Sequence, residues 1–258
     1  MRKKLIFAIA LFSVLVSALT VKSKAKESEY AWYCVRRGNN QPEITESEML
    51  ISKYSGYSID RSVSDDSDKR VIYLTFDAGY ENGNVKKILD TLKEEGVPAA
   101  FFVLDNIIIK NTDIILRMAD EGHLVCNHTR NHANICSMSK EEIKENLEAL
   151  ECIYKEKTGR EMSRFFRFPE GKYSESALKH LDELGYTSVF WSFAYDDWDS
   201  SRQMNKEVAI KKIIDNTHNG AVMLFHPTSK TNAEIMGELI KEWRSMGYEF
   251  GTLEELCK

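Results

Sequence analysis

The residues of this chain that could do acid, base or metal chemistry stand where short apolar runs end. Asp77 closes the run 71–76, and His226 follows the run 221–225. A carboxylate and an imidazole are common partners in moving protons to and from a substrate. Each also has a simpler explanation, because an aspartate after a strand often caps a turn or a helix, and a lone histidine often packs in the core. The chemistry therefore depends on whether the fold brings these run ends together.

Two further histidines, His128 and His132, are four residues apart. This spacing is one helical turn, so both imidazoles could reach one cation. Surface or capping roles are the alternative, but a position after another apolar run favours a metal site beside Asp77. The other histidines are expected to be structural, in the core or on solvated helix faces: His123, His180 and His218.

Arg167 ends an aromatic run, where a buried guanidinium needs a partner. That partner is either a structural carboxylate or Asp77, which the arginine would then keep ionised and aimed. Asp197 lies in the loop after the run 187–191. We expect it to orient His226 and to favour its protonated form.

The elements that must position these residues follow from the alternation of short apolar runs with amphipathic segments after Val71. This alternation predicts repeated βα units and a mostly parallel sheet. Helices are predicted near 84–95, 112–121, 140–157, 174–184, 205–217 and 232–246, and strands near 71–76, 99–103, 123–126, 164–168, 187–191, 221–225 and 248–251. About seven strands fit a distorted (β/α) barrel better than an open sheet, which is the alternative. In a barrel, the reactive strand ends would share one rim.

Composition limits the partners and the number of domains. At 258 residues and 43% hydrophobic, the chain can bury the core of one large α/β domain. Its net charge of −5 gives no general attraction to nucleic acid or to an anionic membrane. The five cysteines lack the spacing of a zinc site and are interpreted as small buried hydrophobes.

The first residues are typical of an export signal. A basic start precedes an apolar run, and small residues follow, with cleavage expected after Ala18 or, as second choice, after Ala25. A retained single-span anchor is the alternative and would be the only contact with a membrane. We therefore divide the chain into a signal or anchor with linker (1–28), an extension of unknown role (29–70) and the main domain (71–258). The oligomeric state is left open.

Taken together, the motifs resemble the polysaccharide deacetylase family, also called the NodB-homology group or carbohydrate esterase family 4. Five motifs occur in the family's order: Thr75-Phe76-Asp77, His128-x-x-x-His132, Arg167-x-Pro169-x-Gly171, Asp197-Trp198 and Leu224-x-His226. Finer features, such as Ser229-x-x-Asn232-Ala233-Glu234, resemble the branch that removes the acetyl group from muramic acid residues of peptidoglycan, toward the muramic δ-lactam of spore cortex.

The resemblance implies a hydrolase that acts on an acetamide, with Asp77 as general base, His226 as general acid, and Arg167 and Asp197 as their supports. It implies a divalent cation, zinc by preference, held by His128, His132 and Asp77. Most members have a second aspartate where this chain has Ala78, so the cation is expected to be weakly held or dispensable.

The substrate implied is a peptidoglycan strand in the cell wall or the space between forespore membranes. Substrate contacts are expected from Trp198, Trp191 and Tyr173, and backbone N–H groups in the loop after Tyr173 could complete an oxyanion site. Core packing would also explain either tryptophan. Two alternatives stay open: a deacetylase of N-acetylglucosamine or chitin-type glycans, and a non-catalytic glycan-binding relative whose metal site has decayed.

Overall fold

A curled parallel sheet forms the centre of the molecule. The computed structural model describes residues 28–258, so the predicted export signal lies outside the described residues. Neighbouring strands run in the order β10-β3-β4-β5-β6-β8-β2, and β9 also pairs with β3. These strands are β2 (Gly56–Tyr57), β3 (Arg70–Ala78), β4 (Ala100–Val103), β5 (Leu124–Asn127), β6 (Ser163–Phe166), β8 (Thr187–Val189), β9 (Ala221–Phe225) and β10 (Tyr248–Phe250).

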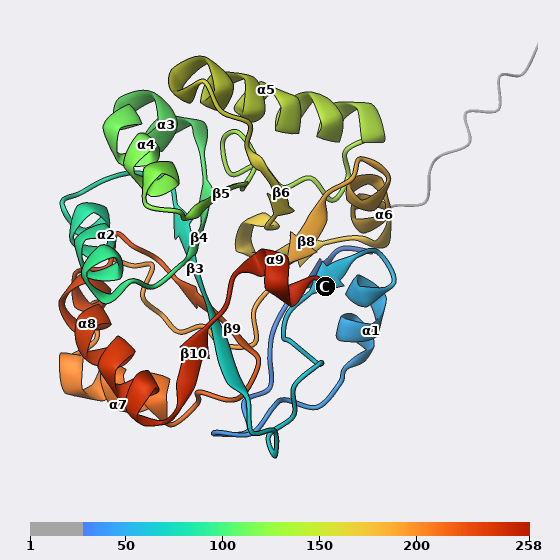
Figure 1. The fold of residues 1–258 in the computed structure, drawn as a ribbon. Helices are drawn as coiled ribbons and strands as arrows, with labels where there is room; N and C mark the ends of the chain where they lie inside the picture. Colours follow the sequence, from blue (N-terminus) through green and yellow to red (C-terminus); the bar gives the residue numbers. More distant parts are fainter. Residues whose placement is uncertain (1–27) are drawn as a thin grey trace, which may run out of the picture.

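The two ends of this sheet approach each other. Phe193, after β8, forms a single parallel bridge with Met223 of β9, and Ile59, after β2, forms an antiparallel bridge with Ala221. Helices surround the strands in a ring (Figure 1). The predicted distorted (β/α) barrel is therefore confirmed, and the open sheet is not what forms.

Most of the helices lie outside the sheet. The helices are α1 (Glu46–Ser52), α2 (Asn84–Glu95), α3 (Asp105–Lys110), α4 (Thr112–Asp120), α5 (Lys140–Thr158), α6 (Glu175–Glu183), α7 (Lys206–Ile214), α8 (Lys230–Ser245) and α9 (Leu253–Leu256). Six of the helices in the described residues lie near the predicted ranges, whereas α1, α3 and α9 were not predicted. A 3₁₀ turn, η1 (Pro169–Gly171), leads into β7 (Lys172–Tyr173), which pairs antiparallel with β1 (Tyr30–Ala31). Within residues 28–258, none of these helices combines the length and the apolar character that crossing a bilayer requires.

Strand β3 shows how alternation positions the site. Ile72, Leu74, Phe76 and Ala78 pack in the core between the sheet and the helices, whereas Val71 and Tyr73 belong to the core inside the barrel. Because side chains alternate along a strand, Thr75 and Asp77 also face the interior, above Tyr73. Helix α9 contributes Leu253 and Leu256 to the same inner core, and Figure 1 shows this helix in front of the strands. The interior is therefore filled at one end and carries polar groups at the other.

The structure differs from the predicted elements in a few places. Asp77 lies within β3 and does not follow it, and the short strand β2 makes an eighth member of the sheet. Strand β2 belongs to the segment 29–70, which we had separated from the main domain. His218 lies after α7, not on a solvated helix face; it is buried and its Nε2 is 2.8 Å from the hydroxyl of Ser192.

Candidate active site

Asp77 and Arg167 form a buried ion pair at the carboxyl end of β3. One guanidinium nitrogen donates to Asp77 Oδ1 at 2.9 Å, and another donates to Thr75 Oγ1 at 2.9 Å. Burial alone would raise the pKa of Asp77, but the charge of Arg167 and, less strongly, those of the neighbouring histidines hold that pKa below its ordinary 3.8. Asp77 is therefore ionised at neutral pH.

Arg167 is itself fully buried and has further partners. Its Nε donates to the carbonyl of Val189 at 3.0 Å, and Nη2 also donates to the carbonyl of Phe190 at 3.1 Å. The guanidinium lies over the ring of Phe102, 4.2 Å from its centroid. These contacts satisfy a charge that would be costly to bury unpaired, so the carboxylate of Asp77 is held in one place.

His128 is tied to the same group. Its Nδ1 is 2.9 Å from the backbone carbonyl of Arg167, which makes Nδ1 the donor and leaves the lone pair on Nε2. Nε2 lies 3.6 Å from Asp77 Oδ2. Burial lowers the pKa of His128 to about 4, so the ring is a neutral imidazole with a free lone pair, the form that binds a metal ion.

His132 completes the pair of histidines, although not on a helix. Residues 128–132 form an irregular loop after β5, in which Thr129 and His132 both have positive φ angles, of 66° and 62°. The two rings are 5.0 Å apart between centroids, with His128 buried and His132 exposed. The two imidazoles therefore lie close together as predicted, but an irregular loop brings them together and not the helical turn that the spacing had suggested.

The donor set fits a cation only in part. Imidazoles are good ligands for zinc, and Asp77 Oδ2 lies beside His128. Ala78 supplies no donor; it is fully buried and packs in the outer core. In the part of the chain that the structure describes, no group of three or more histidine, cysteine, aspartate or glutamate side chains is placed to hold a metal. His128 and His132 are therefore the side chains that would hold a cation here.

His226 is held by a second polar cluster. Its Nδ1 lies 2.7 Å from Oδ1 of Asp197, and its backbone N–H donates to Oδ2 at 2.8 Å. Asn232 donates to the same Oδ2 at 2.6 Å and to the carbonyl of His226 at 3.1 Å. Burial would lower the pKa of His226, but the charge and hydrogen bond of Asp197, and then Asp77, raise it above 6.5. The ring therefore favours its protonated form.

Asp77 and His226 line one open cavity of about 760 Å³. Trp198, whose side chain is 64% exposed, and the half-buried Trp191 line it as well. Both tryptophans thus form part of the cavity wall. Tyr173 does not: it is fully buried in a core cluster with Phe168 and Phe190, so its side chain is not available to a substrate.

Three residues that sequence reasoning missed also belong to this site. Arg36 and Glu170 line the cavity, and Asn232 supports Asp197. Asn232 had been noted only as part of a resemblance, and the hydrogen-bonding partners of an asparagine have no signature in sequence. Glu170 has a positive φ of 56°, and the residue types around it did not allow this backbone conformation to be predicted.

Comparisons with known proteins agree with this geometry. The polysaccharide deacetylase family matches residues 64–189. An uncharacterised 30.6 kDa protein of Geobacillus stearothermophilus is 38% identical, over 87% of this chain and 84% of its own length. The peptidoglycan-N-acetylmuramic acid deacetylase PdaA of Bacillus subtilis is 34% identical, over 96% of this chain and 94% of its own.

The solved structure of Bacillus subtilis PdaA, a family 4 carbohydrate esterase, superposes with a TM-score of 0.82 at 33% identity, covering 88% of this chain and 96% of that one. Fold, motif order and sequence identity over nearly the whole chain therefore coincide. The chain belongs to the polysaccharide deacetylase family, the NodB-homology group known as carbohydrate esterase family 4.

Proposed function

We propose that this protein removes the acetyl group from N-acetylmuramic acid residues of peptidoglycan, a step on the route to the muramic δ-lactam of spore cortex. The observation that carries the reaction type is the pairing of two groups with opposite pKa shifts across one cavity. Asp77, with a lowered pKa, is ionised, whereas His226, with a raised pKa, favours the protonated form. Separated pKa values of this kind indicate a base and an acid that work together.

Asp77 acts as the general base. An amide resists hydrolysis because its carbonyl carbon is a poor electrophile, so the attacking water must lose a proton as it adds. The carboxylate accepts that proton while Arg167 keeps it in position through the 2.9 Å bond. A contribution of about a hundredfold or more is typical of such a base.

His226 acts as the general acid. After water adds to the carbonyl carbon, the C–N bond breaks only if the leaving nitrogen is protonated. His226 Nδ1 donates to Asp197, so Nε2 carries the proton that passes to the leaving nitrogen. The products are acetate and the free amine of the sugar. Asp77 has then gained one proton and His226 has lost one, and proton transfer through water restores both groups.

Deacetylases of this family are generally metal-dependent, and His128 and His132 would hold the cation here. A bound zinc ion would polarise the acetyl carbonyl and lower the pKa of a water ligand. The neutral form of His128, fixed by the carbonyl of Arg167, keeps one lone pair available for that purpose.

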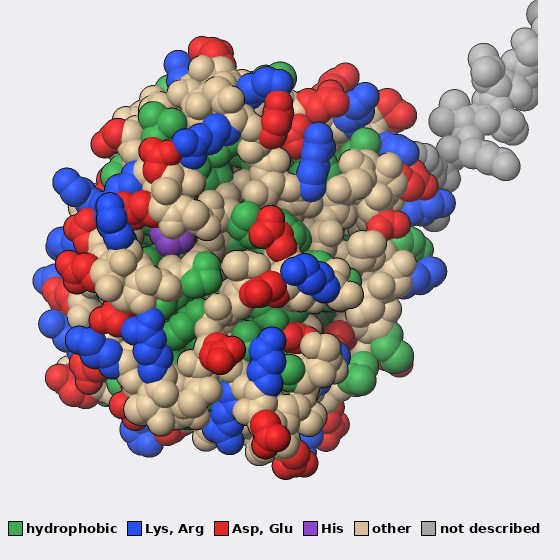
Figure 2. Space-filling model, viewed as in Figure 1, with side chains coloured by type: hydrophobic (Ala, Val, Ile, Leu, Met, Phe, Trp, Pro, Cys, Tyr) green, Lys and Arg blue, Asp and Glu red, His purple; other side chains and the backbone are tan. Residues whose placement is uncertain are grey.

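Three further observations support a glycan of the cell wall as substrate. PdaA of Bacillus subtilis, which is named for N-acetylmuramic acid, matches this chain almost from end to end. The exposed face of Trp198 on the cavity suits a sugar ring. Acidic and basic side chains are interspersed on the face drawn in Figure 2, without the single-sign surface that a polyanion such as nucleic acid would favour.

Peptidoglycan fragments with N-acetylmuramic and N-acetylglucosamine termini, incubated side by side and analysed by mass spectrometry, test this function. Muramic fragments should lose the mass of one acetyl group, with release of acetate. The Asp77→Asn variant is the matched control: the amide oxygen can still accept a bond from Arg167, so the fold should be kept while turnover is lost. If only the glucosamine fragments lost acetyl groups, the substrate would be N-acetylglucosamine and not N-acetylmuramic acid. If neither fragment lost acetyl groups in the presence of zinc, the proposed function would be refuted.

A further inference from the structure

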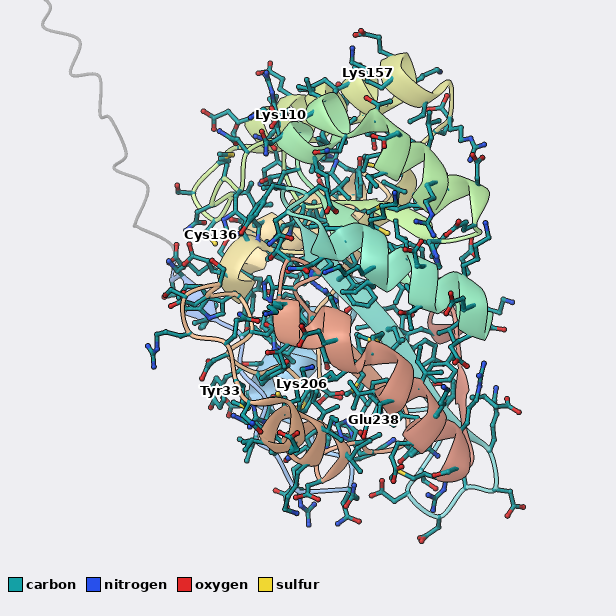
Figure 3. The ribbon with its side chains drawn as sticks, turned by 90° about the vertical axis from the view of Figure 1, so that its left-hand side faces the viewer. Tyr33, Lys110, Cys136, Lys157, Lys206 and Glu238 are labelled. Atoms are coloured by element: carbon teal, nitrogen blue, oxygen red, sulfur yellow. The ribbon has the colours of Figure 1, made fainter. Side chains whose placement is uncertain are left out.

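Arg36 reaches the active-site cavity from the N-terminal segment, far from the catalytic residues in sequence. It lines the same cavity as Asp77 and His226. In Figure 3, Tyr33 of this segment lies on the same side of the molecule as Cys136, which follows the loop of His128 and His132. The segment preceding the barrel therefore contributes to the wall of the site.

The chain around Arg36 is fixed at both ends. On one side, the backbone N–H of Trp32 donates to the carbonyl of Gly171 at 2.8 Å, and its indole N–H donates to the carbonyl of Trp191 at 2.9 Å. On the other side, the side chain of Asn39 donates to a carbonyl at the end of α7 at 2.8 Å. Arg36 thus lies in a segment, residues 32–39, whose two ends are hydrogen-bonded to the rest of the molecule beside the cavity.

The guanidinium of Arg36 is oriented but not neutralised. It donates to the carbonyl of Ala194, beside the cavity, and lies over the ring of Phe193, 5.3 Å from the centroid. Among the residues that the structure describes, these are the contacts shown for its side chain, and no carboxylate lies within ion-pair distance. Its neighbour Arg37, by contrast, is paired with Glu43 at 3.3 Å. With five N–H donors on a guanidinium, Arg36 keeps most of its hydrogen-bonding capacity for a ligand.

The other charges on the cavity wall are mostly engaged. Asp77 is paired with Arg167, Glu170 is paired with Lys172 at 2.7 Å, and His226 is paired with Asp197. Asp196 also lines the cavity, exposed and without an ion pair to Arg36. Arg36 is consequently the cation on this wall that is free to meet an anionic part of a substrate.

A muramic acid residue offers such an anion in the right neighbourhood. Its acetamide is on C2 of the sugar, and the adjacent C3 carries a lactyl ether that ends in a free carboxylate where the stem peptide has been removed, whereas glucosamine has only a hydroxyl there. If the acetamide is bound between Asp77 and His226, the lactyl carboxylate must lie elsewhere in the same cavity. We propose that Arg36 binds this carboxylate and so selects muramic acid; the inference rests on the proposed function. Arginine is well suited to the task because its planar fork can hold both carboxylate oxygens.

The test compares one peptide-free muramic oligosaccharide in two forms, with the lactyl carboxyl free and as its methyl ester, using zinc-supplied enzyme. For the wild type, we expect KM to be lower for the free acid by roughly five- to tenfold, because the ion pair is partly exposed to solvent. In the Arg36→Gln variant this difference in KM between acid and ester should vanish. Arg36→Lys should keep part of the preference, since it keeps the charge and loses the fork.

Arg37→Gln is the matched control, since this residue is adjacent, exposed and paired outside the cavity; it should discriminate as the wild type does. Equal KM values for acid and ester in the wild type would overturn the inference, and so would a preference that survives in Arg36→Gln. Failure of the proposed function looks different, because the wild type would then release no acetate from either muramic form.

Discussion

The structure predicts that one buried histidine far from the active site makes the protein sensitive to acid. His123 lies just before β5 and is only 6% exposed, with its ring set edge-on to that of Phe101 at 5.5 Å. Neither ring nitrogen has a hydrogen-bond partner within residues 28–258. Burial lowers the pKa of His123 to about 4, against 6.5 for the ordinary side chain.

The sign and size of the effect follow from linkage. Because the folded pKa lies below the unfolded one, the unfolded chain binds the extra proton first as the pH falls below 6.5. The free energy of unfolding therefore decreases between pH 6.5 and about 4. At pH 5 the loss attributable to His123 is about 2 kcal/mol, which is a large part of the stability of a typical domain.

Urea unfolding of the wild type and of His123→Leu at pH 7.5 and pH 5.0, followed by circular dichroism, measures this directly. At pH 7.5 the two proteins should differ little, because leucine replaces an unpaired polar ring in an apolar setting. At pH 5.0 the variant should be more stable by about 2 kcal/mol. The acid sensitivity of His218, whose pKa burial also lowers to about 4, is present in both proteins and cancels.

His123→Gln serves as the control, since it removes the titration but keeps a polar side chain. It should be less stable than His123→Leu by a similar amount at both pH values and, like His123→Leu, should lack the extra loss at pH 5.0. The reasoning is refuted if His123→Leu and His123→Gln lose as much stability as the wild type between the two pH values. His123 would then take up its proton in the folded protein as readily as in the unfolded chain.

Three predictions concern the active site. In Asp197→Asn, the aspartate charge no longer offsets the effect of burial, so the pKa of His226 falls. The decline of kcat on the alkaline side of the pH profile should then move to lower pH. A decline at the same pH as in the wild type would exclude His226 as the general acid. Arg167→Met leaves the carboxylate of Asp77 buried without its partner. Urea unfolding should therefore show a free energy of unfolding lower by about 3–5 kcal/mol. A loss under about 1 kcal/mol, the size expected of an exposed ion pair, would contradict the buried pairing. His128→Ala removes the buried lone pair, so dialysis should strip zinc from the variant under conditions in which the wild type retains it, as read by elemental analysis; equal retention would place the cation elsewhere.

Sequence periodicity was sufficient to predict the helices that bury a long apolar stripe. Helix α2 begins and ends where predicted, because its stripe is bounded by Gly83 and Gly96, both left-handed. The two-residue strand β2 escaped prediction because it is too short to show a period. The region 105–120 forms two helices, of which the sequence revealed only the second, since Asn111 interrupts an apolar run without a proline or glycine.

The site was predictable to the extent that its residues sit at strand ends. The expected pair of Asp77 and Arg167 forms, and Asp197 meets His226, because parallel strands deliver their carboxyl ends to one rim. The contribution of Arg36 was not predictable. It depends on hydrogen bonds from the segment 32–39 to the carbonyls of distant residues. Residue types and their spacing in the sequence do not reveal such bonds.

Arg167 links the geometry of the site to the alignment of the strands around it. Its backbone N–H donates to the carbonyl of Asn127 at the end of β5, and its backbone carbonyl orients His128. Its guanidinium reaches Asp77 on β3 and the carbonyls of Val189, the last residue of β8, and Phe190, which follows it. One residue after β6 therefore joins the ends of the neighbouring strands to both the carboxylate and a histidine. The buried charge is tolerated because each contact that stabilises it also aligns a group at the rim, so a change that loosens the curled sheet here should misplace Asp77 and His128 together.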